Sequence, residues 1–300
     1  MTTFTGCGTA LVTPFHKDQS LDEETLRRLV RRQIDAGIDF LVPCGTTGES
    51  PTLTRREHLR VVEIAVEESR KSKRKVPVLG GAGGYNTAEV IELAREIEHS
   101  GADGILSVTP YYNKPTQEGL YQHFKAIATA VPLPMIVYSV QGRTSINVEP
   151  GTLKRLAQID NIVGVKEASG NIGQMARVIH EVPGRFAVLS GDDSITLPLI
   201  ALGGRGIVSV VSNEIPAEMT QLAHAALAGD FEKARGLQRE WLPLMEINFV
   251  ESNPIPVKAA MAMMGLLEPV WRLPMTPPSE QNHANIEGVL ESCGLLAHAS

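Results

Sequence analysis

Short apolar runs rich in β-branched residues recur along the first two thirds of the chain, and each ends in polar or glycine-rich residues. Eight such runs are present, at 9–14, 40–45, 76–83, 104–110, 134–140, 162–169, 186–193 and 206–211. Segments between them, such as 21–37, 54–71 and 87–101, carry apolar residues at helical spacing and acidic residues in the first turn. The pattern therefore predicts strands and helices in alternation.

The predicted strands are apolar almost throughout, which is typical of strands buried on both faces of a parallel sheet covered by helices. Eight strand–helix units over about 210 residues match an α/β fold, the (β/α)8 TIM barrel, which typically has ~250 residues. A doubly wound parallel sheet is the alternative that this pattern leaves open.

The strand signal stops after Glu214, and segments 231–250, 255–265 and 285–296 have the pattern of further helices. We therefore expect a barrel with the active site over residues 1–230. Residues 231–300 are expected to form a C-terminal all-helical extension.

Composition narrows the possible partners of a chain with 300 residues and a net charge of −6. A negative net charge does not indicate the positively charged surface that binds nucleic acid or an acidic membrane. The basic run 70–75 falls at the end of a predicted helix, where cations complement the helix dipole, which favours a solvated helix end over a binding patch. No signal-peptide pattern and no run of roughly 18 apolar residues is present. We expect a cytoplasmic protein with no nucleic-acid or membrane partner.

Metal and cofactor motifs are missing from the sequence. The three cysteines have no paired or metal-type spacing, so we expect free thiols, and the eight histidines are scattered. Segment 81–86 resembles a dinucleotide-binding loop but lacks its third glycine. We therefore expect neither a metal nor a cofactor.

A barrel presents its reactive groups where the strands end, and two of the predicted strands end in reactive side chains. Lys166 closes the run 162–169, and Tyr138 closes the run 134–140. Burial disfavours the charged form of a lysine and favours a nucleophilic amine. Adjacent strands would place the Tyr138 phenol beside it for proton transfer. The alternatives are a structural lysine paired with Glu167 and a core tyrosine, although period-2 alternation sends Lys166 and Glu167 to opposite faces.

Other strand ends offer groups for binding a carboxylate. Thr46 and Thr47 follow the second run, and their hydroxyls can bind a carboxylate or relay a proton, although simple turn chemistry explains them too. Arg143 follows the fifth run; its planar fork can hold a carboxylate with two hydrogen bonds, and a surface arginine is the alternative. Gly191 and Val208, near the ends of the last two runs, can offer backbone groups to a small ligand.

Two tyrosines, Tyr111 and Tyr112, close the fourth run, where they serve either chemistry or packing at an interface.

The segments "GTTGES", "VTPYYNKP", "QEGLYQHFKAI", "YSVQGRT", "GVKEASGN", "LSGDD" and "NPIPVK" occur in this order along the chain. Together they resemble the pyruvate-dependent class I aldolase family over essentially the whole chain. The resemblance implies a (β/α)8 barrel with C-terminal helices. It also implies a homotetramer, arranged as a dimer of dimers, that needs no metal or organic cofactor.

The resemblance also implies roles for the candidate residues. Lys166 would form a Schiff base with pyruvate, and Tyr138 would move protons together with Thr46. Tyr112 would complete this relay from a neighbouring subunit. The pyruvate contacts would come from Thr47 and Val208, and the carboxylate of the second substrate would bind Arg143.

Within the family, the motifs are most similar to those of enzymes that condense pyruvate with L-aspartate 4-semialdehyde, in the first committed step of diaminopimelate and lysine biosynthesis. Arg143 favours this reaction because a small aldehyde that bears a carboxylate needs the guanidinium fork. The alternatives are a sister lyase or aldolase acting on N-acetylneuraminate, a keto-deoxy-sugar acid or 4-hydroxy-2-oxoglutarate. A catalytically silent pyruvate-binding barrel is a third possibility.

Two departures from the family pattern carry expectations. Relatives inhibited by lysine bind it at a subunit interface, and the matching residues are Ser50, His58, Tyr85, Glu89 and Tyr111. Here Tyr85 replaces the usual Asn, and Arg55 adds a cation that would repel lysine, so inhibition is left open. Ser139 and Gln141 stand where the family commonly has Asn and Pro. We expect looser placement of Arg143 and a higher KM for the aldehyde.

Overall fold

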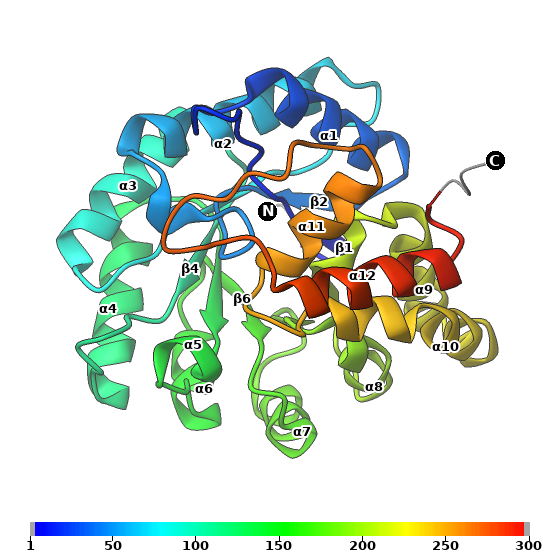
Figure 1. The fold of residues 1–300 in the computed structure, drawn as a ribbon. Coiled ribbons are helices and arrows are strands. Elements are labelled where there is room, and N and C mark those ends of the chain that lie inside the picture. The colour runs from blue at the N-terminus through cyan, green and yellow to red at the C-terminus, as the bar shows by residue number, and fades with distance from the viewer. Residues whose placement is uncertain (1–3, 297–300) are drawn as a thin grey trace.

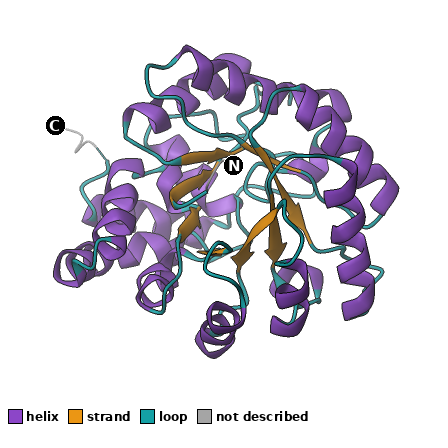
Figure 2. Cartoon of the chain, turned by 180° about the vertical axis from the view of Figure 1, so that it is seen from behind, coloured by secondary structure: helices purple, strands orange, loops and turns teal. Residues whose placement is uncertain are grey.

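Each apolar run contains a strand or overlaps one, and the strands pair side by side in parallel to make the barrel at the centre of the computed structural model (Figures 1 and 2). The structure describes residues 4–296. Within this range the strands are β1 Gly6–Ala10, β2 Phe40–Val42, β3 Leu79–Gly81, β4 Gly104–Val108, β5 Met135–Ser139, β6 Ile162–Glu167, β7 Ala187–Ser190 and β8 Gly206–Ser209.

Helices surround the strands on the outside, as Figure 2 shows. Those that alternate with the strands or follow β8 are α1 Glu23–Asp35, α2 Arg55–Lys71, α3 Thr87–His99, α4 Gln117–Ala130, α5 Gln141–Thr144, α6 Pro150–Leu156, α7 Ile172–Glu181, α8 Thr196–Ala201 and α9 Pro216–Leu227. The C-terminal helices are α10 Phe231–Ile247, α11 Ile255–Met263 and α12 Glu280–Ser292. The predicted boundary at residue 230 falls between α9 and α10.

The order of the strands confirms the barrel. Hydrogen-bonded neighbours run β2-β1-β8-β7-β6-β5-β4-β3, and a parallel bridge between Leu41 and Val78 joins β2 to β3. This cyclic order excludes the doubly wound alternative, in which strand order reverses at a switch point.

The first predicted strand was placed too late in the chain. The apolar run begins at Thr9, whereas β1 covers Gly6–Ala10. A Cβ at Gly8 would lie 2.1 Å from Cε2 of Phe40, and Gly6 has a φ of +85°. These positions need glycine for close approach and for backbone conformation, so β-propensity could not reveal them.

Alternation along the strands divides the apolar side chains between two layers. In β5, Met135 and Val137 point outward to the helices, while Ile136 and Tyr138 point into the barrel. The buried members of the interior layer are Phe4, Ala10, Phe40, Val42, Leu79, Leu106, Ile136, Tyr138, Val140, Leu189 and Val208. The barrel is therefore filled by side chains up to the ends of its strands.

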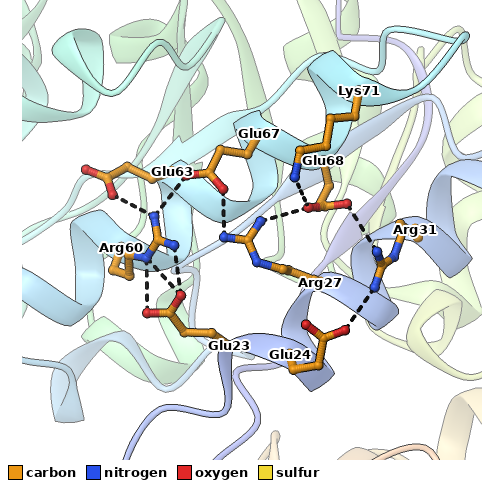
Figure 3. Close-up of polar contacts among 9 residues, drawn as sticks. All are labelled: Glu23, Glu24, Arg27, Arg31, Arg60, Glu63, Glu67, Glu68 and Lys71. Atoms are coloured by element: carbon orange, nitrogen blue, oxygen red, sulfur yellow. Dashed lines mark hydrogen bonds and ion pairs between the residues drawn. The ribbon is translucent and has the colours of Figure 1, made fainter.

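Helices α1 and α2 are joined on the outside of the barrel by a network of ion pairs (Figure 3). Arg27 contacts Glu67 and Glu68, each at 2.7 Å, and Arg60 contacts Glu23 at 2.8 Å. Lys71, at the end of α2, pairs with Glu68 at 2.9 Å. The basic run that includes Lys71 thus lies at a helix end, as predicted.

The C-terminal region crosses one end of the barrel. Figure 1 shows α11 and the segment that follows it, both orange, in front of the strands, and α12, red, lying along α10. Within residues 4–296, no helix is long and apolar enough to cross a membrane.

Candidate active site

The pairing of β5 with β6 brings two predicted catalytic residues together. Tyr138 and Lys166 are direct partners in the register, and Nζ of Lys166 lies 4.3 Å from the centre of the Tyr138 ring. Both side chains are almost fully buried. The predicted proximity of Tyr138 and Lys166 is confirmed.

Glu167 points to the opposite side of β6 and does not pair with Lys166. Its Oε1 accepts hydrogen bonds from the Ser169 amide at 3.3 Å and from Nε2 of Gln174 at 3.0 Å, and burial raises the pKa of its carboxyl. Within residues 4–296, Lys166 forms no ion pair. The alternative of a structural lysine paired with Glu167 is therefore wrong.

Gly191 and Val208 lie where the predictions placed them, around the barrel interior. A Cβ at Gly191 would lie 3.1 Å from Cε of Lys166, so the bare backbone leaves space beside this lysine. Val208 is fully buried on β8 in the interior layer that contains Tyr138. Neither Gly191 nor Val208 lines the cavity described next.

A cavity of about 490 Å³ opens at the carboxyl ends of β2 to β5. Thr46, Tyr138 and Arg143 line it, and residues 253–254 and 274–275 of the C-terminal region close one side. Lys166 lies against the ring of Tyr138, which lines the cavity, and does not line it itself. A substrate in the cavity therefore passes the Tyr138 side chain to reach the Lys166 amine.

The turn after β2 carries the two threonines. Thr46 lines the cavity, whereas Thr47 is buried and its Oγ1 accepts a hydrogen bond of 2.9 Å from Nδ2 of Asn253. Cys44 and Glu49, on either side of the threonines, have φ angles of +58° and +50°. Burial raises the pKa of the Cys44 thiol, which fits the predicted packing role.

Arg143 belongs to the one-turn helix α5 and is exposed at the edge of the cavity. Its Nη2 donates a hydrogen bond to the carbonyl of Asn253 at 3.2 Å, and no carboxylate among the described residues pairs with the guanidinium.

Ser139, which stands where the family commonly has Asn, still has a hydrogen-bond partner. Its hydroxyl accepts a hydrogen bond from the amide of Val148 at 3.1 Å.

Tyr112 is far more exposed than the other candidates. Its side chain is 91% exposed, its φ is +68°, and it does not line the cavity of its own chain. Tyr111 does line the cavity and packs edge-on against Tyr85 with ring centres 5.2 Å apart. Burial raises the pKa of the Tyr111 phenol.

The residues predicted for a lysine effector are only partly brought together. Ser50, His58 and Tyr111 line the cavity, whereas Tyr85 and Glu89 do not. Nε2 of the buried His58 donates to the carbonyl of Gly81 at 2.8 Å, and burial lowers the pKa of this ring.

Arg55, the cation expected to repel lysine, forms an ion pair of 2.7 Å with Glu96. This pairing partly neutralises the charge on which the expected repulsion depends.

Three residues that touch this site were not identified as functional from the sequence: Asn253, Glu49 and Lys258. Asn253 bonds to both Thr47 and Arg143, and its Oδ1 is buried without a hydrogen-bond partner among residues 4–296. Glu49 lines the cavity and pairs with Lys258. The "NPIPVK" motif holds Asn253 and Lys258, but more than 200 residues separate them from the threonine turn.

The chain is similar to known proteins along nearly its whole length. The model of the dihydrodipicolinate synthetase family matches residues 3–293. A 4-hydroxy-tetrahydrodipicolinate synthase from Koribacter versatilis is 53% identical over 296 residues, with 98% of each chain covered.

Two solved structures are similar in shape. A chloride-inhibited dihydrodipicolinate synthase from Acinetobacter baumannii, complexed with pyruvate, superposes with a TM-score of 0.95 at 43% identity, covering 98% of this chain and 100% of that one. The corresponding enzyme of Cyanidioschyzon merolae, with lysine bound, gives a TM-score of 0.93 at 40% identity, covering 98% and 99%.

Proposed function

The chain belongs to the dihydrodipicolinate synthetase family, and from this premise we propose that it condenses pyruvate with L-aspartate 4-semialdehyde through a Schiff base at Lys166. The product is 4-hydroxy-tetrahydrodipicolinate, and the reaction is the first committed step of diaminopimelate and lysine biosynthesis. The observation that carries this proposal is the register pair of Tyr138 and Lys166 beneath the cavity. It supplies an amine nucleophile and a proton-transfer group side by side.

The first half of the reaction activates pyruvate. The Lys166 amine adds to the ketone carbon, and loss of water gives an iminium. The iminium draws electrons from the methyl group, which loses a proton to form an enamine. Tyr138 is the group that moves protons at this carbon and at the departing hydroxyl, because the centre of its ring lies 4.3 Å from Nζ of Lys166.

The second half forms the carbon–carbon bond and releases the product. The enamine carbon attacks the aldehyde carbon of L-aspartate 4-semialdehyde, and the aldehyde oxygen takes up a proton. The amino group of that substrate then displaces the Lys166 amine and closes the ring. These steps use groups of the protein and the two substrates and require no metal or organic cofactor.

The remaining candidates hold the two carboxylates. Thr47, Val208 and Gly191 surround pyruvate in this proposal, with Thr46 relaying protons to Tyr138. Arg143, exposed at the cavity edge and without a carboxylate partner in the part of the chain that the structure describes, receives the carboxylate of the second substrate.

Assembly completes the proton relay in this proposal. Tyr112 is 91% exposed and lies outside the cavity of its own chain, which suits a residue that enters a neighbouring subunit. We place the chain in a homotetramer, a dimer of dimers, in which each Tyr112 serves the adjacent site.

The cavity also extends toward the predicted effector residues. Ser50, His58 and Tyr111 line it together with Tyr138, which favours lysine binding at its outer part. Activity that stays flat across millimolar lysine would remove this regulatory role.

The reaction is tested with the wild-type protein. A coupled assay with pyruvate and L-aspartate 4-semialdehyde should show turnover, and sister-aldolase substrates should not replace the aldehyde. Borohydride reduction in the presence of pyruvate should attach one adduct, which peptide mass spectrometry places on Lys166. An adduct on another lysine would contradict the assignment.

A further inference from the structure

A second buried lysine lies behind the threonine turn. Lys258, on α11, is fully buried, and its Nζ contacts Oε1 of Glu49 at 2.5 Å and the carbonyl of Thr13 at 3.1 Å. The same Nζ lies 4.5 Å from the centre of the Phe15 ring. Oε2 of Glu49 accepts the amide of Arg272 at 3.2 Å. Both charged groups are thus buried and bonded to groups of the protein.

Such a pair is not explained by stability alone. The desolvation of two charges offsets much of their attraction, and an apolar pair of similar volume often stabilises a core as well. A buried ion pair does, however, fix the relative position of the segments that carry it. Here it joins α11 to the turn after β2, two segments separated by 209 positions in the chain.

The turn that holds Glu49 needs such an anchor. Cys44 and Glu49 both have left-handed backbone conformations, which cost conformational energy in residues other than glycine. The Glu49 amide donates to the carbonyl of Thr46 at 3.1 Å, so any shift of Glu49 moves the threonines as well. The Glu49 carboxylate, held by Lys258 and Arg272, fixes one end of this turn.

Neighbouring contacts aim the Thr47 hydroxyl. Because Oγ1 of Thr47 accepts a hydrogen bond from Asn253, its own hydrogen is directed elsewhere and can be donated. The hydroxyl of Thr13 holds the next residue of the turn by donating to the carbonyl of Gly48 at 2.7 Å. The turn is therefore ordered before any substrate arrives.

We propose that Lys258 and Glu49 are positioning residues for pyruvate binding, and that their buried ion pair holds the turn in the conformation that presents Thr46 and Thr47 to the substrate carboxylate. This inference rests on the proposed function, because it takes the two threonines as part of the pyruvate site. Neither Lys258 nor Glu49 touches the reacting atoms.

The test is the double variant Glu49→Gln/Lys258→Met. Each single charge removal would leave the other charge unpaired, whereas the double variant removes both and keeps similar side-chain volumes. We expect the KM for pyruvate to rise about 10-fold or more, since small misplacements of binding groups have effects of this size. The rate of borohydride-trapped adduct formation at saturating pyruvate should change less than about 3-fold, because Lys166 is intact.

The control is Arg27→Met/Glu68→Gln, which removes the Arg27–Glu68 ion pair, one of several between α1 and α2, together with the other contacts of these two side chains in Figure 3. Arg27 and Glu68 do not line the cavity. We expect its melting temperature to fall while the KM for pyruvate stays at the wild-type value.

The possible outcomes distinguish the proposed function from the positioning role of Lys258 and Glu49. If the wild type forms no pyruvate adduct, the proposed function fails. If the wild type forms the adduct and the folded Glu49→Gln/Lys258→Met variant has an unchanged KM, only the positioning role is overturned. Should that variant not fold, Glu49→Asp keeps both charges and shortens the side chain that joins them by one methylene. A smaller rise in the KM for pyruvate would then support the role, and an unchanged KM would overturn it.

Discussion

Lys166 and Lys258 are the two buried lysines within residues 4–296, and their surroundings differ in one respect that decides their chemistry. Both ammonium groups lie near an aromatic ring, Tyr138 for Lys166 and Phe15 for Lys258. Of the two, Lys258 alone has a carboxylate partner among the described residues, and that partner is Glu49. Burial lowers the pKa of Lys258, and the nearby Glu49 carboxylate opposes this shift.

The comparison shows that burial alone does not make a lysine a nucleophile. An acid at hydrogen-bond distance keeps the amine charged and turns it into an anchor. A buried lysine with no carboxylate partner within residues 4–296, beside a phenol and a cavity, is placed to attack a ketone. In our two proposals, Lys166 on β6 is the nucleophile and Lys258 on α11 positions the threonine turn.

The largest effect should come from Lys166→Met, which leaves Lys258 as the one buried lysine among the described residues. We expect the turnover rate to fall by at least ~10⁴-fold, because the covalent route is lost and Lys258 cannot replace it. The coupled assay measures the rate. Mass spectrometry after borohydride treatment should find no pyruvate adduct, and an adduct on Lys258 would contradict the comparison.

A carboxylate placed beside Lys166 should make it resemble Lys258. Leu189 is the register partner of Lys166 on β7 and points into the same interior layer. In Leu189→Glu, the new charge should favour the ammonium form and slow adduct formation about 10- to 1,000-fold relative to Leu189→Gln, which has the same size without the charge. Equal trapping rates in these two variants at pH 8 would refute the argument.

A smaller effect should come from acid, which weakens the contact between Arg272 of the C-terminal region and Glu57 of α2. The hydrogen bond from Arg272 lowers the pKa of Glu57 to about 2 from its ordinary value of 4.5. A carboxyl with a depressed pKa in the folded state stabilises the protein above pH 4.5, and this contribution is lost as the pH falls toward 2. Between pH 6 and pH 3, the loss amounts to about 2 kcal/mol.

Glu57→Gln should remove this pH dependence while it preserves the capping box of α2, in which glutamine can replace glutamate. Urea unfolding at pH 6 and pH 3 measures the difference. Parallel curves for Glu57→Gln and the wild type would show that Arg272 contributes no electrostatic stabilisation there.

The smallest effect concerns the placement of Arg143. Gln141 begins α5, where proline is tolerated because the first amide of a helix needs no helical partner. We expect Gln141→Pro to lower the KM for the aldehyde about 2-fold and to raise the unfolding free energy by about 0.5 kcal/mol. Ser139→Asn is the companion variant and should change the KM less, since Ser139 already has hydrogen-bond partners. A KM that is unchanged in the combined variant would end this explanation.

Much of this architecture could be predicted because its signals are local. Apolar runs and helical periodicity located the strands and helices, and alternation along β6 separated Lys166 from Glu167. β1 was misplaced because Gly6 and Gly8 are selected by contacts with residues that lie far away in the sequence.

The contacts of Asn253 and Lys258 with the threonine turn were not predicted, for the same reason. The sequence around Thr47 and Glu49 does not indicate that Asn253 and Lys258 contact them. The sequence of an apolar helix does not show which acid its lysine will pair with after folding. Strand ends could be predicted because the barrel dictates their location, whereas the path of the C-terminal region across the barrel could not.

The exposure of Tyr112 has a consequence for mixtures of chains. If each active site borrows this phenol from a neighbour, a chain that lacks Lys166 still carries an intact Tyr112 to donate. Two nearly inactive proteins, Lys166→Met and Tyr112→Phe, should then complement each other once their subunits exchange. Each mixed pair would regain one complete site. A working active site would then need residues from two chains.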